Sequence, residues 1–254
     1  MADMSAAEIN PALPIAQGGK TIYGAALGIL MLEARFPRIP GDMGHAGTWP
    51  FPVLYKVVRG ASPERVVRQR ADGLLDAFLA AADELIRDGA DGITTNCGFL
   101  ALFQHQLAAH CRVPVASSAL LQLPLIQALL PPDRRVGIIT VDSASLSQDH
   151  LAAIGLPADI PIVGTENGRE FSRAILGNEL TLNVALARAD LLQAGQDLQR
   201  RYPEVGAVLL ECTNMAPYSA DLQAALGLPV FDIVNFINWF HAGLRPRRFR
   251  YPEA

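Results

Sequence analysis

The sequence predicts an α/β protein built from two related halves, each with a parallel sheet covered by helices. Short β-branched runs alternate with Ala- and Leu-rich stretches along the 254 residues, and this alternation is typical of parallel sheets wrapped by helices. The runs lack strict polar and apolar alternation, as expected of strands buried on both faces. In addition, the segment around Cys97 recurs around Cys212.

The expected elements follow that alternation in chain order. The strands are expected at Tyr23–Leu32, Phe51–Val58, Gly92–Thr95, Val113–Ala116, Arg135–Val141, Ile160–Val163, Val205–Leu210 and Pro229–Phe231. The helices are expected at Pro63–Asp88, Phe99–His110, Ala119–Leu130, Ser143–Ile154, Asn167–Leu176, Thr181–Arg201, Tyr218–Leu226 and Ile233–Ala242.

The internal repeat indicates which parts of the sequence form the two halves. Cys97 lies 17 residues before Pro114, and Cys212 lies 17 residues before Pro229. Each cysteine follows an apolar strand and opens a helix that leads into a Val-Pro-Val or Leu-Pro-Val strand. We expect the chain after Phe231 to pack back on the first half. The predicted domains are therefore residues 20–117 plus 232–254, and residues 118–231.

Composition excludes several classes of function. The net charge is −4, and the Lys and Arg residues are dispersed, whereas a nucleic-acid surface needs a basic stripe. The N-terminal stretch lacks the features of a signal peptide, and no apolar run reaches the length of a membrane span. We expect a cytoplasmic protein that binds neither nucleic acid nor a membrane.

The chain carries three cysteines, Cys97, Cys111 and Cys212. This odd, sparse count argues against a disulfide scaffold. No Cys-x-x-Cys pair and no histidine cluster at zinc spacing occurs, so no metal site is predicted. The only lysines are Lys20 and Lys56, which leaves few candidates for a Schiff base, and no cofactor is expected.

Cys97 and Cys212 are the candidate catalytic residues. In parallel sheets the ligand site forms at the carboxyl ends of the strands, and both cysteines sit there. The start of a helix lowers the pKa of a thiol and offers free N–H groups to a carboxylate. Two facing turns would present one sulfur to each face of a small carboxylate. One thiolate would remove the proton next to the carboxylate, and the other thiol would return a proton from the opposite face.

Neighbouring residues are candidates for binding the substrate. Asn96 and Gly98 flank the first cysteine, and Thr213 and Asn214 follow the second. Thr140 ends a predicted strand and is a candidate ligand contact.

Three further features permit two readings. Ser118 is either a substrate donor or the cap of the helix from Ala119. Arg35 is either a partner of the substrate carboxylate or a solvated surface residue. The Gly- and Pro-rich segment 36–50 is either a flap over the site or a plain surface loop. Cys111, which ends a helix, is interpreted as structural.

At the two cysteine turns the chain resembles the aspartate/glutamate racemase superfamily. The matching motifs are Thr-Asn-Cys-Gly-Phe at 95–99 and Glu-Cys-Thr-Asn at 211–214, and the resemblance runs from about Gly28 to Trp239. It implies two pseudo-symmetric, Rossmann-like three-layer domains with the active site in the cleft between them and no cofactor. It also implies racemisation of an amino acid or a related small carboxylate, and often a homo-oligomer.

The motifs depart from those of glutamate racemases. Glu211 stands where many relatives have Gly, and Asn214 stands where glutamate racemases have His. The superfamily also contains lyases that act on dimethylsulfoniopropionate, decarboxylases and cis–trans isomerases, and these remain alternatives. The decarboxylases generally keep only the second cysteine, so Cys97 counts against that branch. A non-catalytic binder of a small carboxylate is a further alternative.

Overall fold

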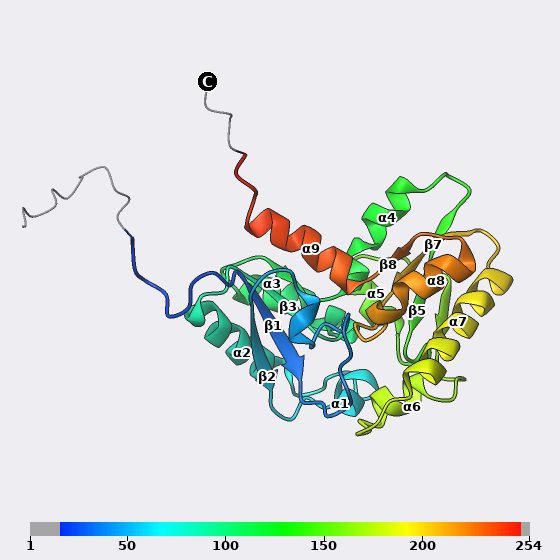
Figure 1. The fold of residues 1–254 in the computed structure, drawn as a ribbon, viewed down its shortest axis with the longest axis horizontal. Coiled ribbons are helices and arrows are strands. Elements are labelled where there is room, and N and C mark those ends of the chain that lie inside the picture. The colour runs from blue at the N-terminus through cyan, green and yellow to red at the C-terminus, as the bar shows by residue number, and fades with distance from the viewer. Residues whose placement is uncertain (1–15, 250–254) are drawn as a thin grey trace, which may run out of the picture.

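The computed structural model describes residues 16–249, which form two four-stranded parallel sheets with helices around them (Figure 1). The first sheet has the order β2-β1-β3-β4 and consists of β1 (Leu27–Leu32), β2 (Val53–Val58), β3 (Gly92–Thr95) and β4 (Val115–Ala116). The second has the order β6-β5-β7-β8 and consists of β5 (Arg135–Thr140), β6 (Ile162–Gly164), β7 (Val205–Leu210) and β8 (Val230–Phe231). The two orders are equivalent, which confirms the fold class and the two related halves.

The helices fall between these strands. The α-helices are α1 (Pro63–Val67), α2 (Leu75–Asp88), α3 (Gln104–His110), α4 (Leu123–Leu129), α5 (Gln148–Ala152), α6 (Phe171–Leu176), α7 (Val184–Arg201), α8 (Ser219–Leu226) and α9 (Ile233–Leu244). Short 3-10 turns lie at η1 (Ala46–Thr48), η2 (Gly98–Phe103), η3 (Ala119–Gln122) and η4 (Ala216–Tyr218).

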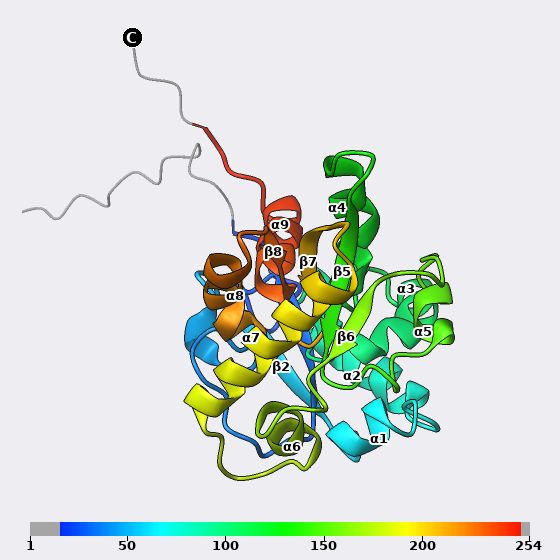
Figure 2. The ribbon, with the colours of Figure 1, turned by 90° about the vertical axis from the view of Figure 1, so that its right-hand side faces the viewer.

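Amphipathic helices cover the sheets. Helix α2 buries Phe78 and Leu85 and packs on β1 and β2. Helix α7 buries Leu191 and Leu198, packs on β5 and β6, and contacts α8, as Figure 2 shows. Strands β1, β3, β5 and β7 are almost fully buried, because helices cover these parts of the sheets on both faces. Strand β2 lies at a sheet edge and leaves Tyr55 and Val57 exposed.

The predicted single helix over 63–88 is wrong. Helix α1 ends at Val67 and α2 begins at Leu75, and the residues between them include Arg70, Ala71 and Gly73 with φ of 56°, 55° and 67°. Left-handed backbone cannot continue a right-handed helix. The break lets α1 lie beside α6 of the second half, in both views of the molecule (Figures 1 and 2).

The C-terminal helix returns to the first sheet. Helix α9 packs on β3, and the ring of His241 stacks on that of Phe51 with centroids 3.5 Å apart. Helix α9 also contacts η3, and the division of the chain into two domains stays a prediction. Residues 250–254 of the predicted first domain, and residues 1–15 of the N-terminal stretch, lie outside the described part.

Two particular features are absent from the described residues. Between residues 16 and 249, none of the helices has the length and apolar character that crossing a bilayer requires. The same residues contain no group of three or more His, Cys, Asp or Glu side chains arranged to hold a metal ion.

Candidate active site

Cys97 and Cys212 occupy equivalent positions at the carboxyl ends of β3 and β7. Cys97 is the residue before η2, and Cys212 comes two residues after β7 ends. Their exposed fractions are 9% and 8%, and both line the same cavity. The fold therefore brings the two thiols of the repeat to one place between the sheets.

The cavity is small and mostly apolar. Its volume is about 20 Å³, which is room for about one water molecule. Seven apolar residues line it, namely Leu32, Phe36, Pro63, Val67, Phe99, Val141 and Ile175. The other lining residues are Asn96, Cys97, Gly98, Glu211, Cys212 and Asn214.

Glu211 places a carboxyl group in this cavity. The side chain is fully buried, and its Oε2 accepts a hydrogen bond of 2.7 Å from Thr140 Oγ1. Its Oε1 is buried and has no hydrogen-bond partner among residues 16–249. Burial raises the pKa of Glu211 to about 8, against a smaller lowering by the Thr140 hydroxyl.

The environment keeps both thiols protonated. Burial first, and then the charge of Glu211, raise the pKa of Cys97 and of Cys212 above its ordinary value. Backbone N–H groups of Phe99 and Leu100 act in the opposite direction on Cys97. The expectation that the turns lower the pKa of the thiols is therefore not met in this small cavity, because burial outweighs the N–H groups at the start of η2 and in the turn after β7.

A hydrogen-bonded chain holds the second thiol. The Cys212 thiol donates to Asn214 Oδ1 at 3.5 Å, and Asn214 Nδ2 donates to Asp42 Oδ2. Asp42 is 2% exposed, and its Oδ1 accepts from Arg38 Nη1 at 2.8 Å and from the N–H of Gly44 at 2.7 Å. Asp42 belongs to the segment 36–50 of the first half, so that segment closes over the Cys212 turn of the second half.

A histidine of the second half packs against the first cysteine turn. His150 is fully buried, and its ring meets that of Phe99 edge to face with centroids 5.2 Å apart. Burial first, and then the positive charge of Arg70, lower the pKa of His150 to about 4. Its imidazole is therefore neutral at pH 7.

Comparison with known proteins identifies the family. Residues 61–239 match the Asp/Glu/Hydantoin racemase family, which is more than half of the chain. The chain belongs to this family. Both cysteine turns lie inside the matched range, whereas Leu32 and Phe36 of the cavity lining precede it.

Curated relatives of this racemase-family chain are lyases. A dimethylsulfoniopropionate lyase of Durusdinium sp. clade D is 28% identical over 230 residues, which cover 87% of this chain and 76% of the relative. Dimethylsulfoniopropionate lyase 6 of Emiliania huxleyi is 29% identical over 230 residues, covering 86% of this chain and 60% of the relative. The chain thus spans about three fifths of the length of that second lyase.

Solved structures with the same fold include a decarboxylase and a racemase. A mutant of arylmalonate decarboxylase in its sulfate-associated form has a TM-score of 0.58 at 17% identity, covering 89% of this chain and 96% of that chain. A glutamate racemase isoform of Bacillus anthracis has a TM-score of 0.56 at 13% identity, covering 87% and 83%. At these identities the likeness extends to the fold alone.

In this racemase-family chain, three of the seven expected binding residues line the cavity. They are Asn96, Gly98 and Asn214. Asn96 also uses its Oδ1 to accept from the N–H of Leu32 at 2.7 Å, and Thr213 Oγ1 donates to the carbonyl of Asn96 at 2.6 Å. Thr213 thereby joins the two cysteine turns directly.

The other expected binding residues lie elsewhere. Thr140 does not line the cavity, but its hydroxyl donates a hydrogen bond to Glu211, which does. Ser118 is buried and caps η3 by accepting from the N–H of Leu120 at 3.2 Å, which supports the reading as a cap. Arg35 is exposed, does not line the cavity, and its backbone N–H donates to Asn178 Oδ1 at 2.6 Å.

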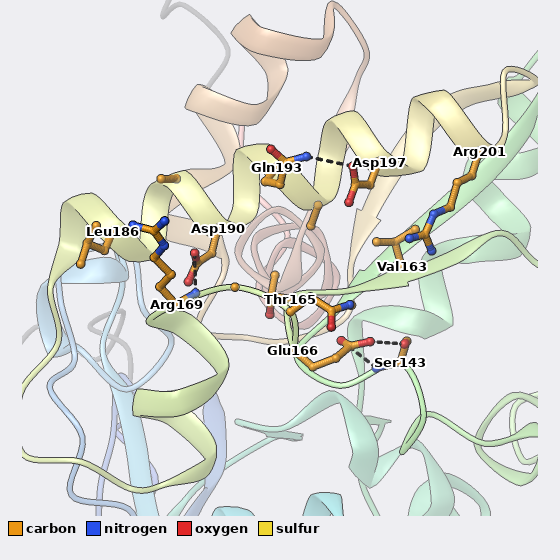
Figure 3. A pocket seen from close by; sticks show the side chains of 15 residues that line it. Ser143, Val163, Thr165, Glu166, Arg169, Leu186, Asp190, Gln193, Asp197 and Arg201 are labelled. Carbon is orange, nitrogen blue, oxygen red and sulfur yellow. Dashed lines mark hydrogen bonds between the residues drawn. The ribbon is translucent and has the colours of Figure 1, made fainter.

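A second cavity lies in the second half, away from the cysteines. It is more open, has a volume of about 330 Å³, and is bordered by β6 and α7 (Figure 3). The carboxylates there already have partners within the chain. Asp190 accepts from the backbone N–H groups of residues 169, 170 and 171, and Glu166 accepts from Ser143. The third carboxylate of this cavity, Asp197, accepts from Gln193 at 2.9 Å and from Arg200 at 2.7 Å, so all three are hydrogen-bonded within the described chain.

Proposed function

We propose that this chain removes the proton from the carbon next to the carboxylate of a small acid, with Cys97 and Cys212 as base and acid. The observation that carries the proposal is that two thiols from equivalent turns of the repeat line one cavity. A substrate between equivalent turns would meet one sulfur on each face. The expected outcome for a two-thiol site is racemisation of an amino acid or a related carboxylate.

The residues at the site support this chemistry. The thiolate of one cysteine takes the proton, which leaves an enolate-like anion on the substrate, and the thiol of the other cysteine donates a proton to the opposite face. Hydrogen-bond donors aimed at the carboxylate oxygens stabilise that anion most in a site without bulk water. Asn96 and Asn214 line the cavity and carry amide groups suited to that role.

The test is proton exchange in deuterated water. Amino acids, hydantoins and small diacids are incubated with the protein, and NMR follows deuterium entering the carbon next to the carboxylate. Cys97→Ala and Cys212→Ala should each abolish inversion, and Cys111→Ala is the matched control, because Cys111 does not line the cavity. Full inversion by either site variant would contradict the proposal, and binding without exchange would favour a non-catalytic binder.

Elimination is a second candidate outcome, and the relatives favour it. All seven curated relatives at this level of similarity are dimethylsulfoniopropionate lyases. In the part of the chain that the structure describes, no lysine or arginine lines the cavity, and Glu211 supplies its one carboxyl group. An ammonium group would need acceptors for three N–H donors, whereas a sulfonium group needs none.

Product mass separates the two outcomes. Racemisation conserves the mass of the substrate, whereas elimination releases the group attached to the second carbon from the carboxylate and leaves an unsaturated acid. Incubation with dimethylsulfoniopropionate and detection of a volatile thioether tests the second outcome directly. Deuterium exchange without loss of mass would support racemisation.

A further inference from the structure

Glu211 is a fully buried carboxyl group with one oxygen left without a partner. Thr140 satisfies Oε2, but Oε1 is buried and accepts or donates no hydrogen bond within the described chain. An unsatisfied buried polar atom is costly and calls for a reason. The side chain lines the same small cavity as both thiols, so the unpartnered oxygen belongs to the reaction site.

The first cysteine turn is shaped around this carboxyl group. A Cβ atom at Gly98 would lie 2.1 Å from Glu211 Oε1 and 2.4 Å from the Glu211 carbonyl oxygen. Only glycine permits that approach. Glu211 of the second half therefore lies against the Cys97 turn of the first half, although it directly precedes Cys212 in sequence.

The three groups influence one another electrostatically. A negative charge on Glu211 raises the pKa of both thiols. Two other charged side chains act on the pair more weakly: Asp42 raises the pKa of Cys212, and Arg38 lowers that of Cys97. Because like charges at short range suppress each other, such a set ionises one group at a time.

We propose that Glu211 is the proton acceptor of the cysteine pair, so that the two thiols and this carboxyl group share a single negative charge. This inference rests on the proposed function. Glu211, whose pKa burial raises to about 8, is ionised in the active form. The first step is then a proton transfer from a thiol to the Glu211 carboxylate, which gives a thiolate and a neutral carboxylic acid. The thiolate then takes the proton of the substrate, and no electron leaves or enters the set.

The same group would reset the site after each turnover. In racemisation the second thiol gives its proton to the substrate and becomes a thiolate, and that thiolate recovers a proton from Glu211. In elimination the leaving group departs with the electron pair of its bond, the thiol keeps the substrate proton, and Glu211 releases its own proton to water. Either route returns two thiols and one carboxylate.

The experiment compares Glu211→Gln with the parent protein, both carrying Cys111→Ala. The glutamine keeps an acceptor for Thr140 and cannot ionise. Ultraviolet absorbance of the thiolate is followed against pH without substrate, after subtraction of the signal of a variant lacking Cys97 and Cys212. Glu166→Gln makes the same chemical change at an exposed position and is the matched control.

Two opposite shifts are expected. Thiolate formation in Glu211→Gln should move to lower pH, because the neighbouring charge is gone. Proton exchange with a substrate should fall by about 100-fold or more, and its rise with pH should move to higher pH, because the most acidic member of the set is lost. A residue that only fills space would produce neither shift.

An unchanged thiolate titration in Glu211→Gln would overturn the inference, even if the protein catalyses exchange. A shifted titration in a protein without exchange would support the coupling and refute the proposed function instead. If Glu211→Gln does not fold, Thr140→Val provides the second variant. Loss of the hydroxyl that stabilises the Glu211 carboxylate should move the exchange profile to higher pH, and an unmoved profile would refute the inference.

Discussion

Replacing Glu211 with glutamine should change how stability depends on pH. The ordinary pKa of the carboxyl group is 4.5, and burial raises it to about 8 in the folded protein. Between these values the unfolded chain has released the proton while the folded protein keeps it. The stabilising contribution is therefore complete below pH 4.5 and is lost as pH rises toward 8. At about 1.4 kcal/mol per pH unit, the loss amounts to about 5 kcal/mol.

The measurement is urea unfolding of the parent protein, Glu211→Gln and the control Glu166→Gln at intervals between pH 5 and pH 8. The parent and the control should lose about 4 kcal/mol relative to Glu211→Gln over this range. Other titrating groups are common to the three proteins and cancel in the difference. Parallel stability curves for the parent and Glu211→Gln would refute the reasoning, because they would mean that Glu211 ionises as readily in the folded protein as in the unfolded chain.

Three further predictions concern neighbours of the site. Asn214→Ala removes the amide that donates to buried Asp42 and should lower the free energy of unfolding by about 1–3 kcal/mol, as measured in urea; no change would mean that water replaces the amide. Gly98→Ala places a Cβ against Glu211 and should cost about 1–3 kcal/mol together with the exchange activity; a fully active variant would contradict the close approach. His150 is neutral in the fold with a pKa of about 4, so stability should fall by about 3 kcal/mol as pH decreases from 6.5 to 4. His150→Gln should flatten that acid limb in thermal unfolding, and an unchanged limb would contradict the assignment.

The sequence predicts the sheets well because their signal is local. All eight expected strands overlap the eight observed strands, since each is a short apolar run bounded by Gly, Pro or charged residues. The break between α1 and α2 was not predictable in this way. Arg70 and Ala71 adopt left-handed backbone, which ordinary residues do only when tertiary contacts impose it.

The site is predictable as far as the repeat extends. The repeat identifies Cys97 and Cys212, and their immediate neighbours Asn96, Gly98 and Asn214 follow by adjacency. Arg35 is a candidate by its charge and its place just beyond the first strand, and the sequence leaves open whether it binds the substrate or lies on the surface, where the structure has it exposed.

The groups that sequence analysis missed are Glu211, Asp42 and Phe36. Glu211 carries a usable signal, because a carboxylate at the end of the apolar run Val205–Leu210 must be buried with it. Asp42 and Phe36 lie in the irregular segment 36–50, and the contact of Asp42 with Asn214 spans 172 positions. Hydrophobic periodicity and motif spacing do not indicate contacts between residues so far apart along the chain.

The volume of the cavity sets a condition on how any substrate is admitted. Room for one water molecule is too little for even a three-carbon acid, so the lining of the cavity must open before a reactant can reach the sulfurs, and separation of the two cysteine turns is one way to open it. Separation would withdraw Asp42 from Asn214 and Asn96 from Thr213, since each pair has one member in each half. It would also expose the Glu211 side chain to solvent. Entry of the reactant and ionisation of the acid groups would then be linked equilibria. Water would stabilise the charge in the open site, and this would end when the two halves close around the bound reactant.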